Sequence, residues 1–127
     1  MAKQVINIPG APQRPFSPAI RAGDYVFVSG QAGFQDRETG EAIEGIQAQT
    51  GQCLQKTKQV LEMAGASLED VVKVTVFLGN TADYARMNEV YQSYFSEDHP
   101  ARSTVITGLV NPDMLVEIEC IAYSPAG

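Results

Sequence analysis

Two glutamates near the end of the chain are the first residues of this sequence that could carry chemistry. Residues 115–123 alternate as a strand does, and that period of two places Glu117 and Glu119 on one face. Burying an unpaired carboxylate is costly, so these side chains either meet solvent or basic groups, or they line a pocket. In a pocket, one of them could accept a proton or position a water molecule.

An arginine and an asparagine could complete such a pocket. Arg102 begins a strand of small and apolar residues, and its planar guanidinium suits two-point binding of a carboxylate; a surface arginine at a strand start is the alternative. Asn88 lies inside a helical pattern, on its aromatic side, where it either links helix to sheet or reaches a ligand. These residue types indicate an anion-binding pocket for a small carboxylic acid, and they name no reaction.

Other polar and sulfur-containing residues give weaker signals. Ser29 and Gly30 end a strand, where a glycine lets backbone or ligand approach closely, although an ordinary strand end explains the pattern better. His99 lies in a charged turn and is expected to be solvated. Cys53 falls in a helical pattern and Cys120 in a strand pattern, so both are predicted to be buried thiols acting as small hydrophobic side chains.

Length and composition exclude several classes of protein. The 127 residues suit one domain, residues 1–127, and a hydrophobic content of 44% suits a folded one. The net charge of -6 argues against a partner bound through its phosphates, as in nucleic acids. One histidine and two cysteines are too few for a closed zinc site of about four ligands or for a disulfide scaffold.

The distribution of apolar residues also bears on the compartment. No long apolar run follows the basic residue near the N-terminus, so we expect no signal peptide. The longest apolar stretches, within 71–78, are far shorter than a membrane span. With two cysteines at unrelated positions, these features predict a cytoplasmic protein without a membrane partner.

Periodicity and turn residues predict six strands and two helices. The strands are expected at 3–8, 19–22, 25–29, 71–78, 103–107 and 115–123, and the helices at 45–66 and 82–95. Two helices on one face of a mixed sheet make a two-layer α+β domain. The other face then lacks cover, although the run 71–78 is nearly continuous in apolar character. We therefore predict a homo-oligomer built through that face.

The order and spacing of several motifs carry a family resemblance. The sequence resembles the RidA/YjgF family of reactive-intermediate deaminases over nearly its whole length. The matching segments are 15–19, 23–31, 39–40, 49–50, 71–78, 87–91, 100–105 and 116–122.

This resemblance implies a fold and an activity. The implied fold is chorismate-mutase-like, a homotrimer with its sheets packed inward and three pockets at the subunit interfaces. The implied activity is hydrolysis of enamine and imine intermediates, such as 2-aminoacrylate, to 2-oxo acids and ammonia. No metal or cofactor is implied, and the partner is a small imino or 2-oxo carboxylic acid.

The resemblance also assigns roles to individual residues. Arg102 matches the arginine that holds the substrate carboxylate, and Glu117 matches the glutamate thought to position or activate the attacking water. Holding the carboxylate orients the reacting carbon, which lowers the entropic cost of reaction. A carboxylate acting as general base adds roughly 10²–10⁴-fold in rate.

Five residues are implied to line the substrate pocket. Ser29 and Gly30 match a wall at a strand end, and Asn88 matches a pocket amide. Thr104 stands where many members have cysteine, and there backbone groups are thought to contact substrate. Phe16 stands where the best-known branch has a tyrosine, so this chain lacks that hydroxyl.

Two other functions remain open. One is a non-catalytic or regulatory protein that binds small carboxylic acids through Arg102. The other is an endoribonuclease or translation inhibitor, against which the shortage of basic residues weighs. A chaperone-like role has no signal in the sequence.

Overall fold

The computed structural model describes residues 2–95 and 97–125. Within these ranges the chain forms six strands, two α-helices and two short 3₁₀ turns. In chain order they are β1 (Gln4–Ile6), β2 (Ala19–Ala22), β3 (Tyr25–Ala32), α1 (Ile46–Met63), η1 (Leu68–Asp70), β4 (Val71–Leu78), η2 (Thr81–Asp83), α2 (Tyr84–Tyr94), β5 (Ala101–Ile106) and β6 (Val116–Tyr123).

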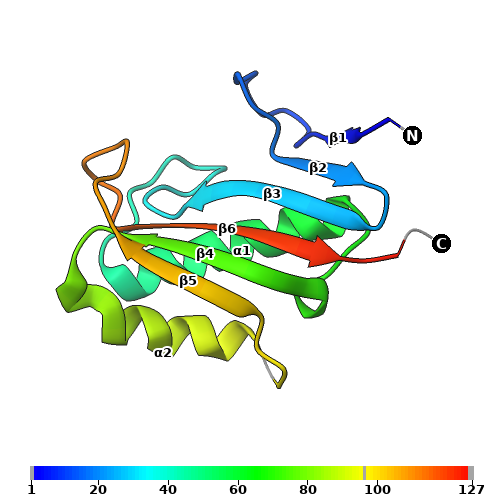
Figure 1. Ribbon diagram of the computed structural model, residues 1–127. Helices are drawn as coiled ribbons and strands as arrows, with labels where there is room; N and C mark the ends of the chain where they lie inside the picture. The colour runs from blue at the N-terminus through cyan, green and yellow to red at the C-terminus, as the bar shows by residue number, and fades with distance from the viewer. Residues whose placement is uncertain (1, 96, 126–127) are drawn as a thin grey trace.

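The strands form one mixed sheet in the order β1-β2-β3-β6-β4-β5. Every described pairing is antiparallel except that of β4 with β5, which is parallel. Figure 1 shows α1 behind the sheet and α2 beside β5. The predicted two-layer α+β architecture with a mixed six-stranded sheet is confirmed.

The core lies between α1 and the sheet, mainly against β3 and β6. The apolar face of α1 buries Cys53, Leu54, Val60 and Leu61 almost completely. The helix ends where its periodicity ends, because Gly65 takes a φ of +82°, a conformation that residues with a Cβ rarely adopt. The amides of Gly65 and Ala66 then donate to carbonyls of the last helical turn.

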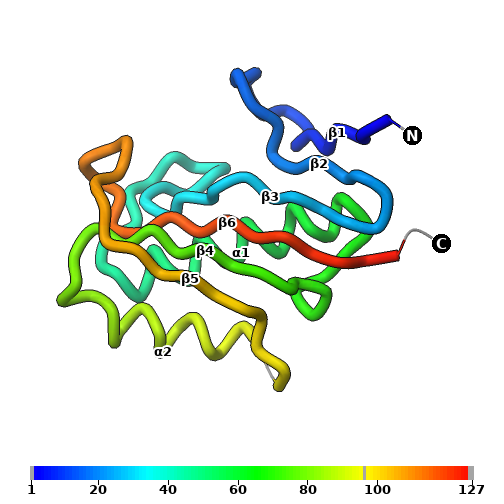
Figure 2. Tube along the Cα trace, in the orientation of Figure 1, coloured from blue at the N-terminus to red at the C-terminus, as the bar shows by residue number. Residues whose placement is uncertain are grey.

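The connection from β4 through α2 to β5 is a βαβ unit. Asn80 caps the 3₁₀ turn at its start, since its side-chain oxygen accepts a hydrogen bond from the Ala82 amide at 2.9 Å. The predicted helix 82–95 begins two residues later than expected, at Tyr84, because η2 precedes α2. Figure 2 shows α2 running back beside β5, and contacts of Arg102 with Tyr84 and Tyr91 show that the two elements are neighbours.

The sheet face away from α1 is largely uncovered in a single chain. Tyr25, Phe27 and Tyr123 are each 45% exposed there, and Tyr25 contacts both other rings. β4 is less apolar on this open face than its sequence suggests, because Lys73 and Thr75 lie there beside Phe77. No helix of the described residues is long and apolar enough to cross a membrane.

Candidate functional site

Arg102 lies on the helix side of the sheet, against α2. In the parallel ladder Arg102 is opposite Val74, whose side chain is buried under the helices. Because side chains alternate along a strand, Thr104 lies on the same side, two residues further. The βαβ connection therefore places both residues beneath the aromatic face of α2.

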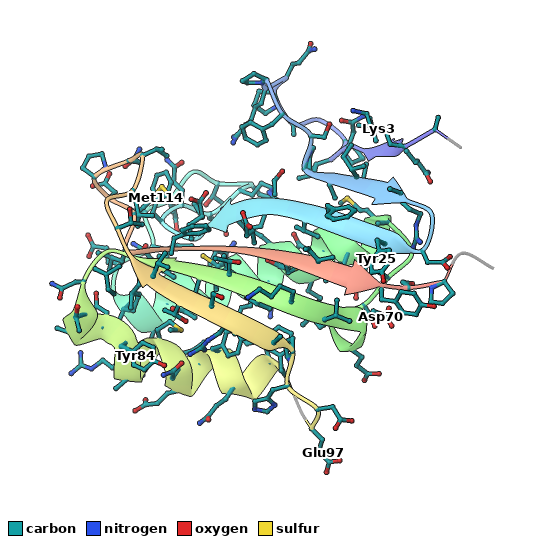
Figure 3. All side chains as sticks on the ribbon, viewed as in Figure 1. Lys3, Tyr25, Asp70, Tyr84, Glu97 and Met114 are labelled. Atoms are coloured by element: carbon teal, nitrogen blue, oxygen red, sulfur yellow. The ribbon has the colours of Figure 1, made fainter. Side chains whose placement is uncertain are left out.

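Two tyrosines of α2 hold the guanidinium group of Arg102. Its Nη2 donates to the Tyr84 hydroxyl at 3.1 Å, and its Cζ lies 4.6 Å from the centre of the Tyr91 ring. Tyr91 is itself buried and packs against Phe95 at a ring separation of 4.9 Å. Figure 3 shows Tyr84 at the exposed start of α2. One edge of the guanidinium is thus fixed through the Tyr84 hydroxyl.

Asn88 acts on the same tyrosine. It follows Tyr84 by one helical turn, and hydrogen bonding by its side chain lowers the pKa of the Tyr84 hydroxyl, as does the positive charge of Arg102. We call Arg102, Tyr84, Asn88 and Tyr91 the clamp half-site.

The backbone of β5 offers further hydrogen-bonding groups beside the clamp half-site. β5 pairs with β4 only and is therefore an edge strand. The amide of Thr107 donates to the Leu78 carbonyl. Along a parallel strand the backbone N–H and C=O groups of successive residues point alternately to one side and the other. Because Thr107 points to β4, the amides and carbonyls of Arg102 and Thr104 point to the free edge. They are available to a ligand bound at the guanidinium.

Glu117 lies on the opposite, open face of the sheet. Its carboxylate is directly above Gly30: a Cβ placed on that glycine would lie 2.7 Å from Oε2 of Glu117. Gly30 belongs to a bulge of β3, where the register with β6 shifts between Val28 and Gln31. Burial raises the pKa of Glu117 above its usual range, and the negative charge of Glu119 raises it further. Glu117 is therefore a better proton acceptor than an exposed carboxylate.

A cleft of about 540 Å³ opens next to this bulge, between the proline-rich loop and the sheet. Phe16, Ser29 and Glu119 are among its lining residues. The Ser29 hydroxyl donates to the Ser17 carbonyl at 2.6 Å, which ties the loop to the end of β3. We call Glu117, Gly30, Ser29 and Phe16 the bulge half-site.

The structure does not bring the two half-sites together within one chain. Glu117 is opposite Phe77 of β4, whereas Arg102 is opposite Val74, so the two side chains leave opposite faces of the sheet. Their strands are also separated by β4, a distance of roughly 9–10 Å. A pocket in which Arg102, Asn88 and Glu117 meet, as residue types suggested, is therefore not formed by a single copy.

Comparison with known proteins identifies the family that shares this sequence and fold. Residues 7–124 match the family described as endoribonuclease L-PSP. A RutC family protein of Pyrococcus abyssi is 49% identical over 97% of this chain and 98% of its own length. The 3-aminoacrylate deaminase RutC of Acinetobacter baylyi is 39% identical over 97% and 99%. The crystal structure of RidA from an Antarctic Psychrobacter superposes with a TM-score of 0.86 at 42% identity, over 94% of this chain and 98% of that one.

The chain belongs to the RidA/YjgF family. Its fold is the YjgF-like fold that the sequence resemblance implied.

The nucleophiles and metal ligands of this RidA/YjgF chain are few. Among the described residues, no three His, Cys, Asp or Glu side chains are grouped so as to hold a metal ion. Cys53 and Cys120 are buried free thiols, as predicted, and burial raises the pKa of each to about 12.

Tyr84 and Tyr91 are the site residues that sequence reasoning missed in this RidA/YjgF protein. The helical spacing places both on the same aromatic side of the helix as Asn88, but it assigns neither of them a role in a site. A usable signal was present, since strand, helix and strand follow one another between residues 71 and 106. A βαβ unit of that length places the inner face of its helix over the second strand, and Arg102 lies on that strand.

Proposed function

We propose that this RidA/YjgF chain is a deaminase that hydrolyses small 2-imino acids, formed from enamines such as 2-aminoacrylate, to 2-oxo acids and ammonia. The observation that carries the proposal is the clamp half-site. There an immobilised guanidinium keeps N–H groups free next to the unpaired backbone of β5. The similarity to a 3-aminoacrylate deaminase supports the reaction class.

The proposed reaction needs only a held carboxylate, a water molecule and a base. Arg102 binds the substrate carboxylate through two parallel N–H groups, which orients the neighbouring C=N carbon. Glu117 accepts a proton from water as the oxygen bonds to that carbon and the C=N double bond opens, and it then passes this proton to the nitrogen. In the collapse of the resulting carbinolamine the hydroxyl proton moves to the nitrogen through Glu117, the C–N bond breaks, the C=O bond forms and ammonia leaves. A base whose pKa is raised toward neutrality suits this role.

The proposed site is shared between copies of the chain. Arg102 and Glu117 leave opposite faces of the sheet, so a substrate held by one arginine needs the glutamate of another copy. The open face that carries Glu117 also exposes Tyr25, Phe27 and Tyr123, an apolar surface suited to contact with further copies. We propose that this assembly is the homotrimer with three such sites that the family resemblance implies.

The test of the reaction is ammonia release from 2-iminopropionate generated in the assay by an amino-acid oxidase. We expect the chain to accelerate release above the rate in buffer, and Arg102→Ala to abolish the acceleration. Glu117→Gln should lose turnover while it still binds 2-oxobutyrate, because the clamp is intact. A wild-type protein that binds 2-oxobutyrate without accelerating release would instead be a non-catalytic carboxylic-acid binder.

The test of sharing is a mixture of two inactive variants. If Arg102→Ala and Glu117→Gln chains are unfolded, mixed equally and refolded together, about a quarter of the sites combine an intact arginine with an intact glutamate. Activity should return to about that fraction of wild type. A mixture that stays inactive, although analytical ultracentrifugation shows that the variants co-assemble, contradicts the shared site.

A further inference from the structure

The clamp half-site holds a residue whose hydroxyl group has no packing function. Tyr84 is the first residue of α2 and is 44% exposed, so its hydroxyl is not needed to satisfy a buried core. That hydroxyl nevertheless accepts a hydrogen bond from Arg102 at 3.1 Å, and Asn88, one helical turn further on, lies near enough to lower its pKa. A surface phenol bonded to an arginine of another element is an organised arrangement, because each long side chain loses rotamer freedom to make it.

The position of Arg102 depends on both tyrosines in different ways. The Tyr91 ring, buried and packed on Phe95, supplies a surface 4.6 Å from Cζ of Arg102. A ring face supports the guanidinium plane but leaves it free to slide and rotate over that face. The hydrogen bond from Nη2 to Tyr84 removes this freedom, because it fixes one end of the planar group. The opposite edge then keeps a defined direction.

We propose that Tyr84 is a positioning residue of this enzyme: its hydroxyl, beside Asn88, locks Arg102 in the orientation that receives the substrate carboxylate. This inference rests on the proposed function, since it assumes that Arg102 binds that carboxylate. It also gives Asn88 a specific role, that of supporting Tyr84 within α2. Asn88 then acts on the substrate through two other side chains.

The geometry predicts which kinetic constant changes. An arginine that is ordered only on binding should lose about 3- to 10-fold in affinity, or about 0.7–1.4 kcal/mol, which is within the cost of immobilising one such side chain. Tyr84→Phe keeps the ring beside Arg102 and removes only the hydroxyl. It should raise the KM for 2-iminopropionate, and the Kd for 2-oxobutyrate, by about 3- to 10-fold. The kcat should stay within about twofold, because Glu117 and its water are on the other half-site.

The matched control is Tyr94→Phe in the same helix. The Tyr94 hydroxyl contacts Gly51 and Gln55 of α1, and it lies outside the site. This variant makes the same chemical change, and both kinetic constants should stay at the wild-type values. Thermal unfolding of Tyr84→Phe should shift by no more than about 2 °C, since an exposed hydroxyl contributes little to stability.

A double-mutant cycle distinguishes positioning from direct contact with substrate. Arg102→Lys keeps the charge, so 2-oxobutyrate binding remains measurable by NMR titration, but it lacks the planar fork. In that background Tyr84→Phe should weaken binding by less than about twofold. The same 3- to 10-fold loss in both backgrounds would overturn the proposal, as would an unchanged KM or a lower kcat in the single variant.

The outcome also separates this proposal from the proposed function. If the wild type turns over 2-iminopropionate and Tyr84→Phe matches Tyr94→Phe, the reaction stands and the role of Tyr84 falls. If the wild type does not turn over but binds 2-oxobutyrate with the predicted coupling of Tyr84 to Arg102, the positioning role stands and the deaminase falls. If the wild type neither turns over nor binds, both are wrong.

Discussion

The contact between Gly30 and Glu117 predicts that a single methyl group will impair catalysis without impairing the fold. A Cβ on Gly30 would lie 2.7 Å from Oε2, 2.8 Å from Cδ and 3.0 Å from Cγ of Glu117. Ordinary contact begins at about 3.4 Å, so in Gly30→Ala the carboxylate must move by about 0.7 Å. The atoms that must move are the far end of a flexible side chain, so the backbone of the bulge can stay in place.

The expected magnitude follows from which group moves. A misplacement of about 1 Å at a reacting group can cost about 10²-fold in rate, so we expect Gly30→Ala to lower kcat by about 10- to 100-fold. The KM should change by less than about twofold, because Arg102 belongs to the other half-site. The free energy of unfolding should fall by no more than about 1 kcal/mol, at the low end of the cost of overpacking, since the carboxylate can rotate away.

The assay is ammonia release from 2-iminopropionate, with thermal unfolding measured in parallel. Gly108→Ala is the matched control, because a Cβ on Gly108 meets no atom within 4 Å, and it should behave as wild type. In a Glu117→Ala background, Gly30→Ala should have no further effect on the residual rate, since nothing is left to displace. A kcat within twofold of wild type for Gly30→Ala alone would refute the placement of the base above Gly30.

Three further predictions concern pH, packing and a buried hydroxyl. Burial and the Glu119 charge raise the pKa of Glu117, so the acid limb of the pH profile of kcat should have its midpoint above pH 4.5. In Glu119→Gln this midpoint should move to lower pH. A wild-type midpoint at or below 4.5 would contradict the prediction. The folded chain holds this proton to higher pH than the unfolded chain, so the contribution of Glu117 to stability falls as pH rises from 4.5 through the folded pKa, and Glu117→Gln should remove that slope in denaturant titrations. Gly33→Ala should lower the free energy of unfolding by about 3 kcal/mol, because the added Cβ would overlap the Gln49 carbonyl in the backbone of α1; an unchanged unfolding midpoint in urea would refute the packing. The Thr104 hydroxyl is buried without a partner in the described part of the chain, so Thr104→Val should leave the free energy of unfolding unchanged or raise it by about 1 kcal/mol. The variant should also retain turnover if only the β5 backbone contacts substrate. Loss of turnover at unchanged stability would assign the contact to the hydroxyl.

Most of the secondary structure could be predicted from local sequence patterns. The alternation of residues 115–123 predicted β6 with Glu117 and Glu119 on one face, and the structure confirms it, with Val116, Ile118 and Cys120 buried on the other face. Gly65 follows α1 and Asn80 caps the turn before α2, and both are local signals because their backbone and side-chain chemistry acts within a few residues. The least accurate boundaries were the ends of β3 and α1, each three residues from the predicted position, and η2 replaces the first two residues of the predicted helix 82–95.

Grouping of the functional residues depended on contacts that no local pattern contains. Period two places Glu117 and Glu119 on one face, but it does not relate that face to Arg102 on another strand. Two strand registers decide this relation: Glu117 pairs with Phe77, and Arg102 pairs with Val74. Residues 74 and 77 differ by an odd number, so the acid and the arginine leave opposite faces.

The sequence by itself determined the elements, the fold class and the residue types available for catalysis, because each of these depends on periodicity or on composition. The tertiary structure decided that the arginine and the glutamate belong to separate half-sites, and that Tyr84 and Tyr91 hold the arginine. The physical reason is that strand order, register and helix placement are set by packing between residues far apart in the chain. A one-residue slip of β5 against β4 would have turned Arg102 to the open face, toward the side that carries Glu117.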